Sequence, residues 1–282
     1  KAKDGSLIFN DEDYVQEFLP NNQWWIPSHN ATEFGSKLLN KIIGKRFNFP
    51  KSLYAVHDAI RFFVANKPNA LILDFFAGSG TTQHAVNLLN AEDGGHRTCI
   101  MVTNNEVSAD EEKRLTQQGY KKGDDEWEKL GIAKYVIWPR TACSIEGKDI
   151  NGKPLKGDYI TDCGRKLKMS DGFKCNVKYF KCDWIPRKPE DYLLSNALCL
   201  HIKEMIELQT GREVDGIKQV LILNKDDYNK VITDPEILAK VETIWLNQNM
   251  ILSPEEMEPL KAKGFKYIPR EFFGHELREA AE

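Results

Sequence analysis

Residues 70–90 combine an apolar run, a glycine turn and a helical pattern, and this combination constrains the fold more than any other part of the chain. The run ALILDFF contains one acidic residue, Asp74, and leads into AGSGTT and then into apolar residues at helical spacing. A continuous apolar run of this length predicts a buried parallel strand, and the spacing after it predicts a helix. The glycines let a ligand approach the backbone at the carboxyl end of that strand.

The residues around the two glycines distinguish between the ligands that such a turn can hold. A dinucleotide-binding turn needs a third glycine where Gln83 stands, and an ATPase-type phosphate loop needs a lysine after Gly80. Neither is present. A ligand without phosphate that carries an amino-acid tail and an adenosine, such as S-adenosylmethionine, suits the turn better, because backbone N–H groups can receive its carboxylate. An ordinary tight turn without a ligand is the alternative that these residues alone leave open.

A second acidic position follows the next predicted strand. Residues 98–103 form another apolar run, and TNNE at 103–106 places Glu106 just beyond its end. In doubly wound sheets an acidic residue after the second strand accepts hydrogen bonds from ribose hydroxyls. Glu106 is therefore the predicted ribose ligand.

Strands that alternate with helices predict an α/β fold, a Rossmann-like doubly wound parallel sheet. Residues 135–138 are predicted as a further strand that stops at Pro139, and residues 173–185 alternate like a strand or hairpin. Helical patterns cover residues 33–44, 53–64, 81–90, 109–118 and 126–130.

Changes in sequence texture predict three parts: residues 1–47, residues 48–185 and residues 186–282. The middle part is the predicted ligand-binding part of the sheet, and the last is a smaller α/β unit. Its predicted elements are a helix over 189–208, strands over 219–223 and 242–246, helices over 227–238 and 255–263, and a closing segment over 266–273.

The overall charge restricts how the chain can meet nucleic acid. Its 282 residues carry a net charge of −3, so any DNA contact must come from a local basic patch, for which Lys41, Lys45 and Arg46 are candidates. A solvated helix face is the other interpretation of that cluster. Arg140, after Pro139, is either an internal ion-pair partner or a DNA contact.

Cysteine and histidine usage predicts no metal site, and the apolar runs predict no membrane segment. The six cysteines form no CxxC pair, and the six histidines are scattered without metal-ligand spacing. No apolar run approaches the roughly 20 residues that span a bilayer. We therefore expect a cytoplasmic protein with reduced thiols.

Three segments together resemble the β class of DNA N6-adenine methyltransferases. They are DFFAGSGTT at 74–82, the upstream FPKS at 49–52, and WWIPSHNATEFGSKLLNKIIG at 24–44, which is similar to the end of the target-recognition region in modification (Mod) subunits of Type III restriction-modification systems. WPRT at 138–141 fits the same pattern. The family more often has Pro-Lys-Pro than the Pro-Lys-Ser found here.

The resemblance implies S-adenosylmethionine as cofactor and transfer of its methyl group to the N6 amino group of an adenine flipped out of double-stranded DNA. The glycine motif and the FPKS segment, which the family places at the methionine end of the cofactor, would bind it together with the ribose ligand. The implied cofactor-binding residues are Phe49, Pro50, Lys51, Ser52, Asp74, Phe76, Ala77, Gly78, Ser79, Gly80, Thr81, Thr82 and Glu106. The resemblance leaves open a homodimer and a restriction subunit as further partners.

One motif of the family is missing from these 282 residues. The catalytic Asp/Asn-Pro-Pro-Tyr/Phe motif, which in the β class precedes the recognition region, has no counterpart, because the sequence contains no Pro-Pro pair. The chain opens with KAKDG and its first methionine is Met101. We therefore expect a C-terminal fragment that supplies the cofactor-binding portion without catalytic residues. The alternative is a non-catalytic binding or assembly module that retains a methyltransferase-like fold.

Overall fold

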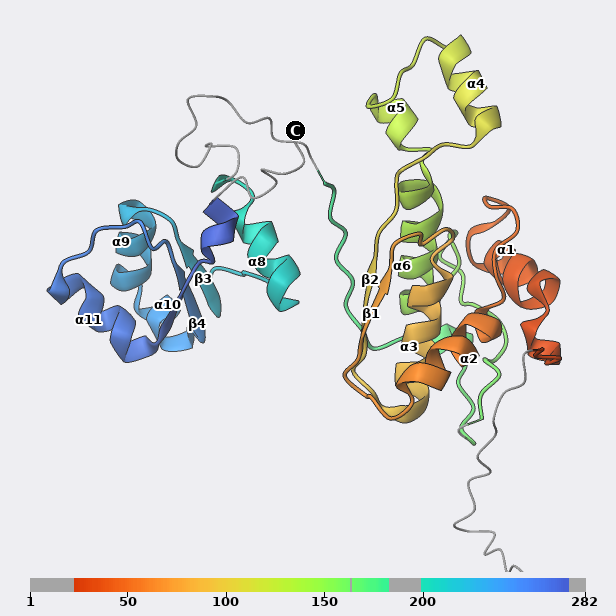
Figure 1. Ribbon diagram of the computed structural model, residues 1–282, viewed down its shortest axis with the longest axis horizontal. Coiled ribbons are helices and arrows are strands. Elements are labelled where there is room, and N and C mark those ends of the chain that lie inside the picture. Colours follow the sequence, from red (N-terminus) through yellow and green to blue (C-terminus); the bar gives the residue numbers. More distant parts are fainter. Residues whose placement is uncertain (1–22, 163, 183–198, 274–282) are drawn as a thin grey trace, which may run out of the picture. The chain divides into compact units, whose positions relative to one another are not determined.

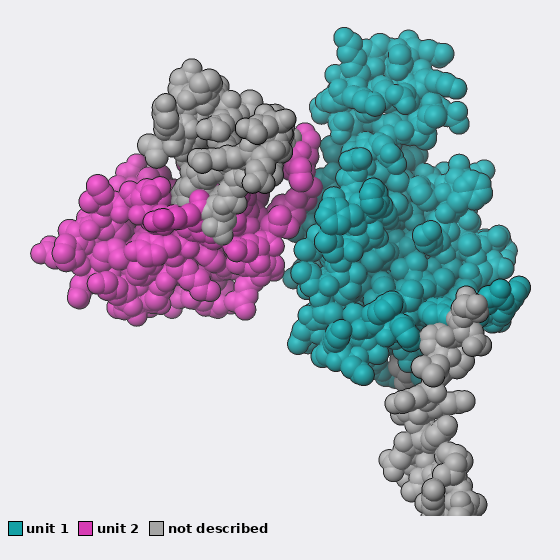
Figure 2. Space-filling view, viewed as in Figure 1, with its two compact units in different colours: residues 1–179 teal, residues 180–282 magenta. Residues whose placement is uncertain are grey.

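The computed structural model describes residues 23–162, 164–182 and 199–273. The chain divides into two compact units, Lys1–Tyr179 and Phe180–Glu282, which Figure 2 shows in different colours. The predicted boundary between residues 185 and 186 lies outside the described residues, as do residues 1–22 of the predicted recognition region and the start of the helix predicted over 189–208.

In the first unit, helices lie on one side of a small parallel sheet (Figure 1). In chain order its elements are η1 (Pro27–His29), η2 (Thr32–Lys37), α1 (Leu38–Ile43), α2 (Leu53–Val64), β1 (Leu71–Asp74), α3 (Thr81–Asp93), β2 (Thr98–Met101), α4 (Ala109–Gln117), α5 (Asp125–Glu128), η3 (Ala133–Ile137), α6 (Trp138–Glu146) and η4 (Met169–Asp171). The strands and helices predicted between residues 33 and 130 are confirmed within a few residues at each end.

Strands β1 and β2 pair in parallel, and helix α3 connects them. The register runs from Leu71 opposite Thr98 to Asp74 opposite Met101. Helix α3 begins directly after the glycine turn and ends at Gly94, whose φ of 75° gives the left-handed cap that glycine adopts without strain. The expected strand, glycine turn, helix and second strand are therefore confirmed.

The prediction that β1 is buried on both faces is wrong for the described chain. Leu71 and Leu73 are 65% and 52% exposed, and Phe75 just beyond them is 60% exposed. These residues alternate along the strand and share one face, because side chains of a strand point to opposite faces in turn. The sheet therefore has an uncovered apolar outer face, whereas parallel sheets in complete domains carry cover on both faces.

The main apolar core of this unit is built by helices and loops. Its buried members come from α1, α2, α3 and the segment after residue 130: Leu39, Ile42, Ile43, Leu53, Tyr54, Ala85, Leu88, Val136, Leu155, Tyr159, Met169 and Phe173. No residue of β1 or β2 belongs to this cluster within the described part of the chain. The unit consequently depends on helix packing more than on its sheet.

Two predicted strands are wrong. Residues 135–138 form no strand but lie in the helical stretch that runs from η3 into α6, with Pro139 in the first turn of α6. Buried Val136, Ile137, Arg140 and Ser144 follow helical spacing, and a short apolar run does not separate a strand from a buried helix. The hairpin expected over 173–185 is also absent from residues 173–182, and residues 183–185 lie outside the described chain.

The second unit is a three-stranded parallel sheet in the order β3-β4-β5. Its elements are α8 (Ile202–Thr210), β3 (Gln219–Ile222), α9 (Lys225–Thr233), α10 (Pro235–Lys240), β4 (Thr243–Leu246), α11 (Pro254–Lys263), β5 (Phe265–Tyr267) and η5 (Arg270–Phe273). The predicted small α/β unit is confirmed. Its single helix over 227–238 is corrected to two helices, because Asp234 caps α10 and Pro235 cannot continue α9.

Both faces of this second sheet are covered. Val220, Ile222, Ile244 and Leu246 face a cluster that includes residues of α9 and α11. Trp245 lies in a different cluster with Ile202 and Ile206 of α8. Throughout the described residues of both units, no helix combines the length and apolar character needed to cross a membrane.

A buried charge network joins three elements of the first unit. His57 of α2 is bound on one side by Asp58 (Nδ1 to Oδ1, 2.9 Å) and on the other by Glu92 of α3 (Nε2 to Oε2, 2.8 Å). Asp58 also contacts His29 of η1 at 2.7 Å. Burial by itself lowers the pKa of His57, but the hydrogen bonds and charges of Asp58 and Glu92 outweigh it and raise this pKa from 6.5 to about 9.

Because the pKa of His57 is higher in the folded than in the unfolded chain, the protonated ring stabilises the fold most below pH 6.5, and this contribution is lost as the pH rises through 9. We expect the first unit to lose on the order of 3 kcal/mol of unfolding free energy over that range. The measurements are an NMR titration of the ring and urea unfolding of the wild type against His57→Gln. A variant with the same pH dependence as the wild type would contradict this assignment.

Candidate functional site at the carboxyl edge of the first sheet

The glycine turn lies where β1 meets α3, at the carboxyl edge of the sheet. The Ala77 N–H donates to the Val102 carbonyl beyond β2 at 3.2 Å, and the Gly80 N–H donates to the Ala77 carbonyl at 2.7 Å. Gly78 and Gly80 have φ values of 52° and 74°. Both values lie in the left-handed region that glycine adopts at little cost, so the two glycines permit this tight turn.

Asp74 closes the turn across its two ends. Its Oδ1 accepts a hydrogen bond from the Phe76 N–H at 3.0 Å, and its Oδ2 accepts one from the Thr82 hydroxyl at 2.6 Å. Both carboxylate oxygens therefore hold the end of the strand against the start of the helix. This geometry gives Asp74 a positioning task, and its predicted contact with a cofactor stays a prediction.

Arg140 of α6 holds the turn from inside the unit. Its Nη1 donates to the Ser79 carbonyl at 3.1 Å, the Ser79 hydroxyl at 3.0 Å and the Thr81 hydroxyl at 2.8 Å. The residue is 1% exposed, and Ser79 and Thr81 are 5% and 6% exposed. Burial rules out the predicted DNA contact, and the described residues include no ion-pair partner for Arg140.

The start of α3 leaves backbone donors free. Gly80 occupies the N-cap position and no side chain caps the helix. The N–H groups of Thr81, Thr82 and Gln83 find no acceptor among the described residues. Unsatisfied N–H groups and the helix dipole favour an anionic group at this point.

The shape of the turn also fits a ligand that approaches the backbone closely. A Cβ added to Gly78 would meet only the Phe76 carbonyl, at 3.7 Å, whereas one added to Gly80 would meet Cγ2 of Ile137 at 3.3 Å. The Gly78 side of the turn is therefore open and the Gly80 side is packed. Phe76, which the sequence places against the adenine of a cofactor, is 92% exposed beside this opening, and that role stays a prediction.

The FPKS segment lies at the start of α2. Ser52 is 2% exposed and caps the helix: its Oγ accepts from the Ala55 N–H at 3.5 Å and donates to the Ser28 carbonyl at 2.8 Å. Pro50 is buried, Lys51 is exposed, and Phe49 is 94% exposed with an unusual φ of 57°. No hydrogen bond or ion pair between described residues joins this segment to the glycine turn.

Glu106 follows β2 on the same edge of the sheet as the turn. Its side chain is exposed, and its backbone carbonyl accepts a hydrogen bond from the Ile132 N–H at 2.8 Å. The carboxylate makes no hydrogen bond or ion pair within the described parts of the chain. It is therefore free for a ligand, and its predicted contact with ribose stays a prediction.

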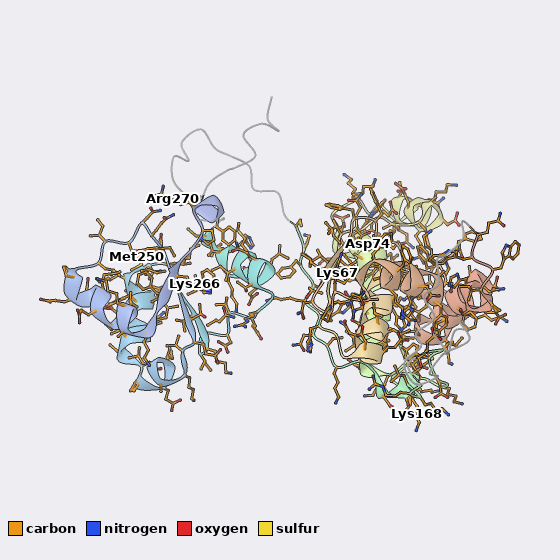
Figure 3. All side chains as sticks on the ribbon, turned by 60° about the horizontal axis from the view of Figure 1, so that its bottom comes forward. Lys67, Asp74, Lys168, Met250, Lys266 and Arg270 are labelled. Atoms are coloured by element: carbon orange, nitrogen blue, oxygen red, sulfur yellow. The ribbon has the colours of Figure 1, made fainter. Side chains whose placement is uncertain are left out.

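A surface hollow elsewhere in the unit competes as a ligand site. It encloses about 580 Å³ and is lined by exposed Lys153, Lys156 and Lys168. Figure 3 shows Lys168 and Asp74, at the turn, on opposite sides of the unit. The glycine turn is the better candidate, because the hollow has no convergent buried polar groups and only the short η4 begins at its rim, whereas α3 is a full α-helix.

A glycine turn joins a strand to an uncapped helix in this α/β unit, and a buried arginine holds the turn from inside. The free N–H groups at this sheet edge favour an anionic group. Residues 7–142 match the model of the DNA methylase family, N6_N4_Mtase. The resemblance noted in the sequence is thereby confirmed.

Three curated proteins are similar to part of this chain, and the chain spans at most a quarter of the length of each. The Type II methyltransferase M.KpnI of Klebsiella pneumoniae is 45% identical over 105 residues, 37% of this chain and 25% of the relative. The EcoPI Mod subunit of a Type III restriction-modification enzyme from Escherichia phage P1 is 34% identical over 109 residues, 37% of this chain and 17% of the relative. The StyLTI Mod subunit from Salmonella typhimurium is 38% identical over 84 residues, 30% of this chain and 13% of the relative.

The packing around Gly80 can be tested by substitution, and Gly94 at the other end of α3 serves as the control position. Gly80 and Gly94 flank the helix with φ values of 74° and 75°, but a Cβ on Gly94 meets nothing within 4 Å. We expect Gly94→Ala to cost roughly 1 kcal/mol for the left-handed backbone alone. Gly80→Ala should cost about 1 kcal/mol more, because Ile137 must also shift.

Urea unfolding of the two variants measures this difference. Equal costs would show that the Gly80 side of the turn is not packed against Ile137.

Proposed function

We propose that this chain supplies the donor-binding part of an S-adenosylmethionine-dependent methyltransferase that methylates the N6 amino group of adenine in DNA, within a restriction-modification system. The observation that carries the proposal is the start of α3, where free N–H groups face a turn that Asp74 and Arg140 hold in place. The DNA methylase match and the restriction-modification relatives support the chemistry.

The residues present fit the parts of this cofactor. The N–H groups of Thr81 and Thr82 would receive the carboxylate of its methionine tail. Glu106 would accept from the ribose hydroxyls, and Phe76 would lie against the adenine. Phe49, Pro50, Lys51 and Ser52 would approach the methionine end, as the family resemblance implies. When bound, the cofactor supplies an electrophilic methyl group on its sulfonium.

In this proposal the chain's own residues bind and orient, and they carry out no proton transfer. Asp74 and Arg140 fix the backbone of residues 76–82, which sets the position of the donor. Holding donor and acceptor in line accounts for much of the rate of such a transfer. The acceptor would be an adenine flipped out of the duplex.

We further propose that β1 and β2 belong to a larger, doubly wound methyltransferase sheet. The exposed Leu71, Leu73 and Phe75 form an apolar outer face of the kind that parallel sheets cover with helices. The curated relatives extend well beyond the matched segment, since the chain covers 25%, 17% and 13% of their lengths. Further secondary structure of the methylase domain would pack on this face.

The partners follow from the same proposal. Double-stranded DNA would be the substrate, met in the cytoplasm, and two of the relatives are named as Mod subunits of Type III restriction-modification enzymes. A restriction subunit and a second copy of the chain are therefore partners to test. The exposed Lys41 and Lys45 remain candidate phosphate contacts on this chain.

A non-catalytic binding module is the second candidate, and the missing Asp/Asn-Pro-Pro-Tyr/Phe motif within these residues favours it. Both candidates have a methyltransferase-like fold and could bind the cofactor, but only the enzyme transfers methyl groups. Labelled methyl transfer to adenine in DNA, with the chain alone and after adding a polypeptide that carries the missing motif, separates the two. Donor binding without transfer in either mixture would support the module.

Cofactor binding itself is tested by isothermal titration calorimetry. We expect S-adenosylmethionine to bind the wild-type chain, and Gly78→Arg to abolish binding because its side chain fills the open side of the turn. Gly94→Arg is the matched control, since it has a similar φ of 75° and lies at the far end of α3. The proposal fails if the wild type shows no binding, or if Gly78→Arg binds as well as Gly94→Arg.

A further inference from the structure

We propose that Arg140 is a positioning residue whose buried guanidinium makes the glycine turn selective for a ligand with a carboxylate. This inference rests on the proposed function and deepens it, because it names the residue that makes the turn prefer a donor with a carboxylate. Arg140 reaches the turn from α6, a helix that otherwise packs in the interior of the unit.

The position of the guanidinium is electrostatically unfavourable unless an anion joins it. It lies at the N-terminal end of α3, where the helix dipole disfavours a cation. The described residues offer it no carboxylate, and burial lowers its pKa to about 10, against a small opposing effect of Tyr159. A buried charge without a counterion destabilises a fold, so a binding role explains its presence better than a structural one.

The hydrogen bonds around Arg140 also favour a carboxylate as the bound group. Nη1 of Arg140 already donates to both hydroxyl oxygens, which lie 3.1 Å apart on Ser79 and Thr81. One hydroxyl hydrogen satisfies the contact between them, and the second has no acceptor within the described residues. Nε of Arg140 is also buried without a partner there. The turn therefore carries an unused hydroxyl donor, with the positive charge and an unpartnered N–H of Arg140 buried behind it.

A neutral acceptor could take these hydrogen bonds, but only an anionic group also gains from the charge of Arg140 and from the dipole of α3. The adenosine of the cofactor is neutral, and its sulfonium and ammonium are cations that Arg140 repels. The carboxylate of the amino-acid tail is the one anion of the ligand, and the free N–H groups of Thr81 and Thr82 lie at the same helix end. Arg140 acts on it through the turn, by orienting Ser79 and Thr81 and by its charge.

The test compares two neutral-sulfur ligands that differ only in the carboxylate: S-adenosylhomocysteine and its decarboxylated analogue. In the wild type we expect the carboxylate to raise affinity by about 10- to 100-fold, as hydrogen bonds to a charged group do. Arg140→Met should reduce this preference to within about threefold, mainly by weakening binding of S-adenosylhomocysteine. Calorimetry with each ligand gives the ratio.

Arg97→Met is the matched control, because Arg97 is equally buried but lies beyond the other end of α3. It pairs with Asp93 at 2.8 Å and donates to the Val64 and Ala65 carbonyls. We expect this variant to lose stability and keep the carboxylate preference. A structural role for Arg140 would make the two variants alike.

Arg140→Lys covers the case in which Arg140→Met does not fold, because lysine keeps the charge and loses the planar donors. We expect it to retain the preference and to speed hydrogen exchange of the amides of residues 78–82. With Arg140→Met, equal weakening of both ligands or an unchanged preference would overturn the inference. With Arg140→Lys, which keeps the charge, loss of the carboxylate preference would overturn it. A wild type that binds neither ligand rejects the proposed function itself, and one that binds both equally rejects this inference alone.

Discussion

The hydrogen bonds from the Arg140 guanidinium join α6 to the loop between β1 and α3, and the geometry of the candidate site depends on them. They fix the Ser79 carbonyl and the hydroxyls of Ser79 and Thr81 from the interior, while Asp74 fixes Phe76 and Thr82 from the sheet side. Because both ends are held, the backbone of the turn and the free amides at the start of α3 keep a fixed geometry. A loop held this way is preorganised for its ligand, which lowers the ordering cost of binding.

The spacing of apolar residues in the sequence predicts most helices and strands of the fold. It fails where packing between distant parts of the chain decides the structure. The run over 70–75 and the glycines after it predicted β1, the turn and α3, because strand and helix periods differ there and glycine marks the break. The run over 135–138 was too short to show a period, so its helix was missed. The outer face of β1 was predicted as buried because sequence shows that a residue is apolar, not what covers it.

In the candidate site, too, contacts between neighbouring residues could be predicted from the sequence, and contacts between distant residues could not. The turn residues were predicted because they are consecutive, but the contacts of Arg140 span about sixty positions in the chain and leave no local signal. A signal did exist in the segment after residue 130: taken as a helix, it places Arg140 on the same face as buried Val136, Ile137 and Ser144. A lone arginine on an apolar helix face indicates a buried polar partner. The role of Asp74 in closing the turn likewise leaves no local signal, whereas Ser52 directly before a helical pattern is a typical N-cap.

The two units differ in how their parallel sheets are covered by helices, and this difference affects the candidate site. In the second unit, α9 and α11 cover one face of the sheet and α8 the other. In the first, the main core contains residues of α1, α2 and α3 and none from β1 or β2. The inner side of the turn is thus anchored to a helical core that forms without the outer cover of the sheet. The candidate site can therefore hold its shape although the outer face of the sheet is uncovered.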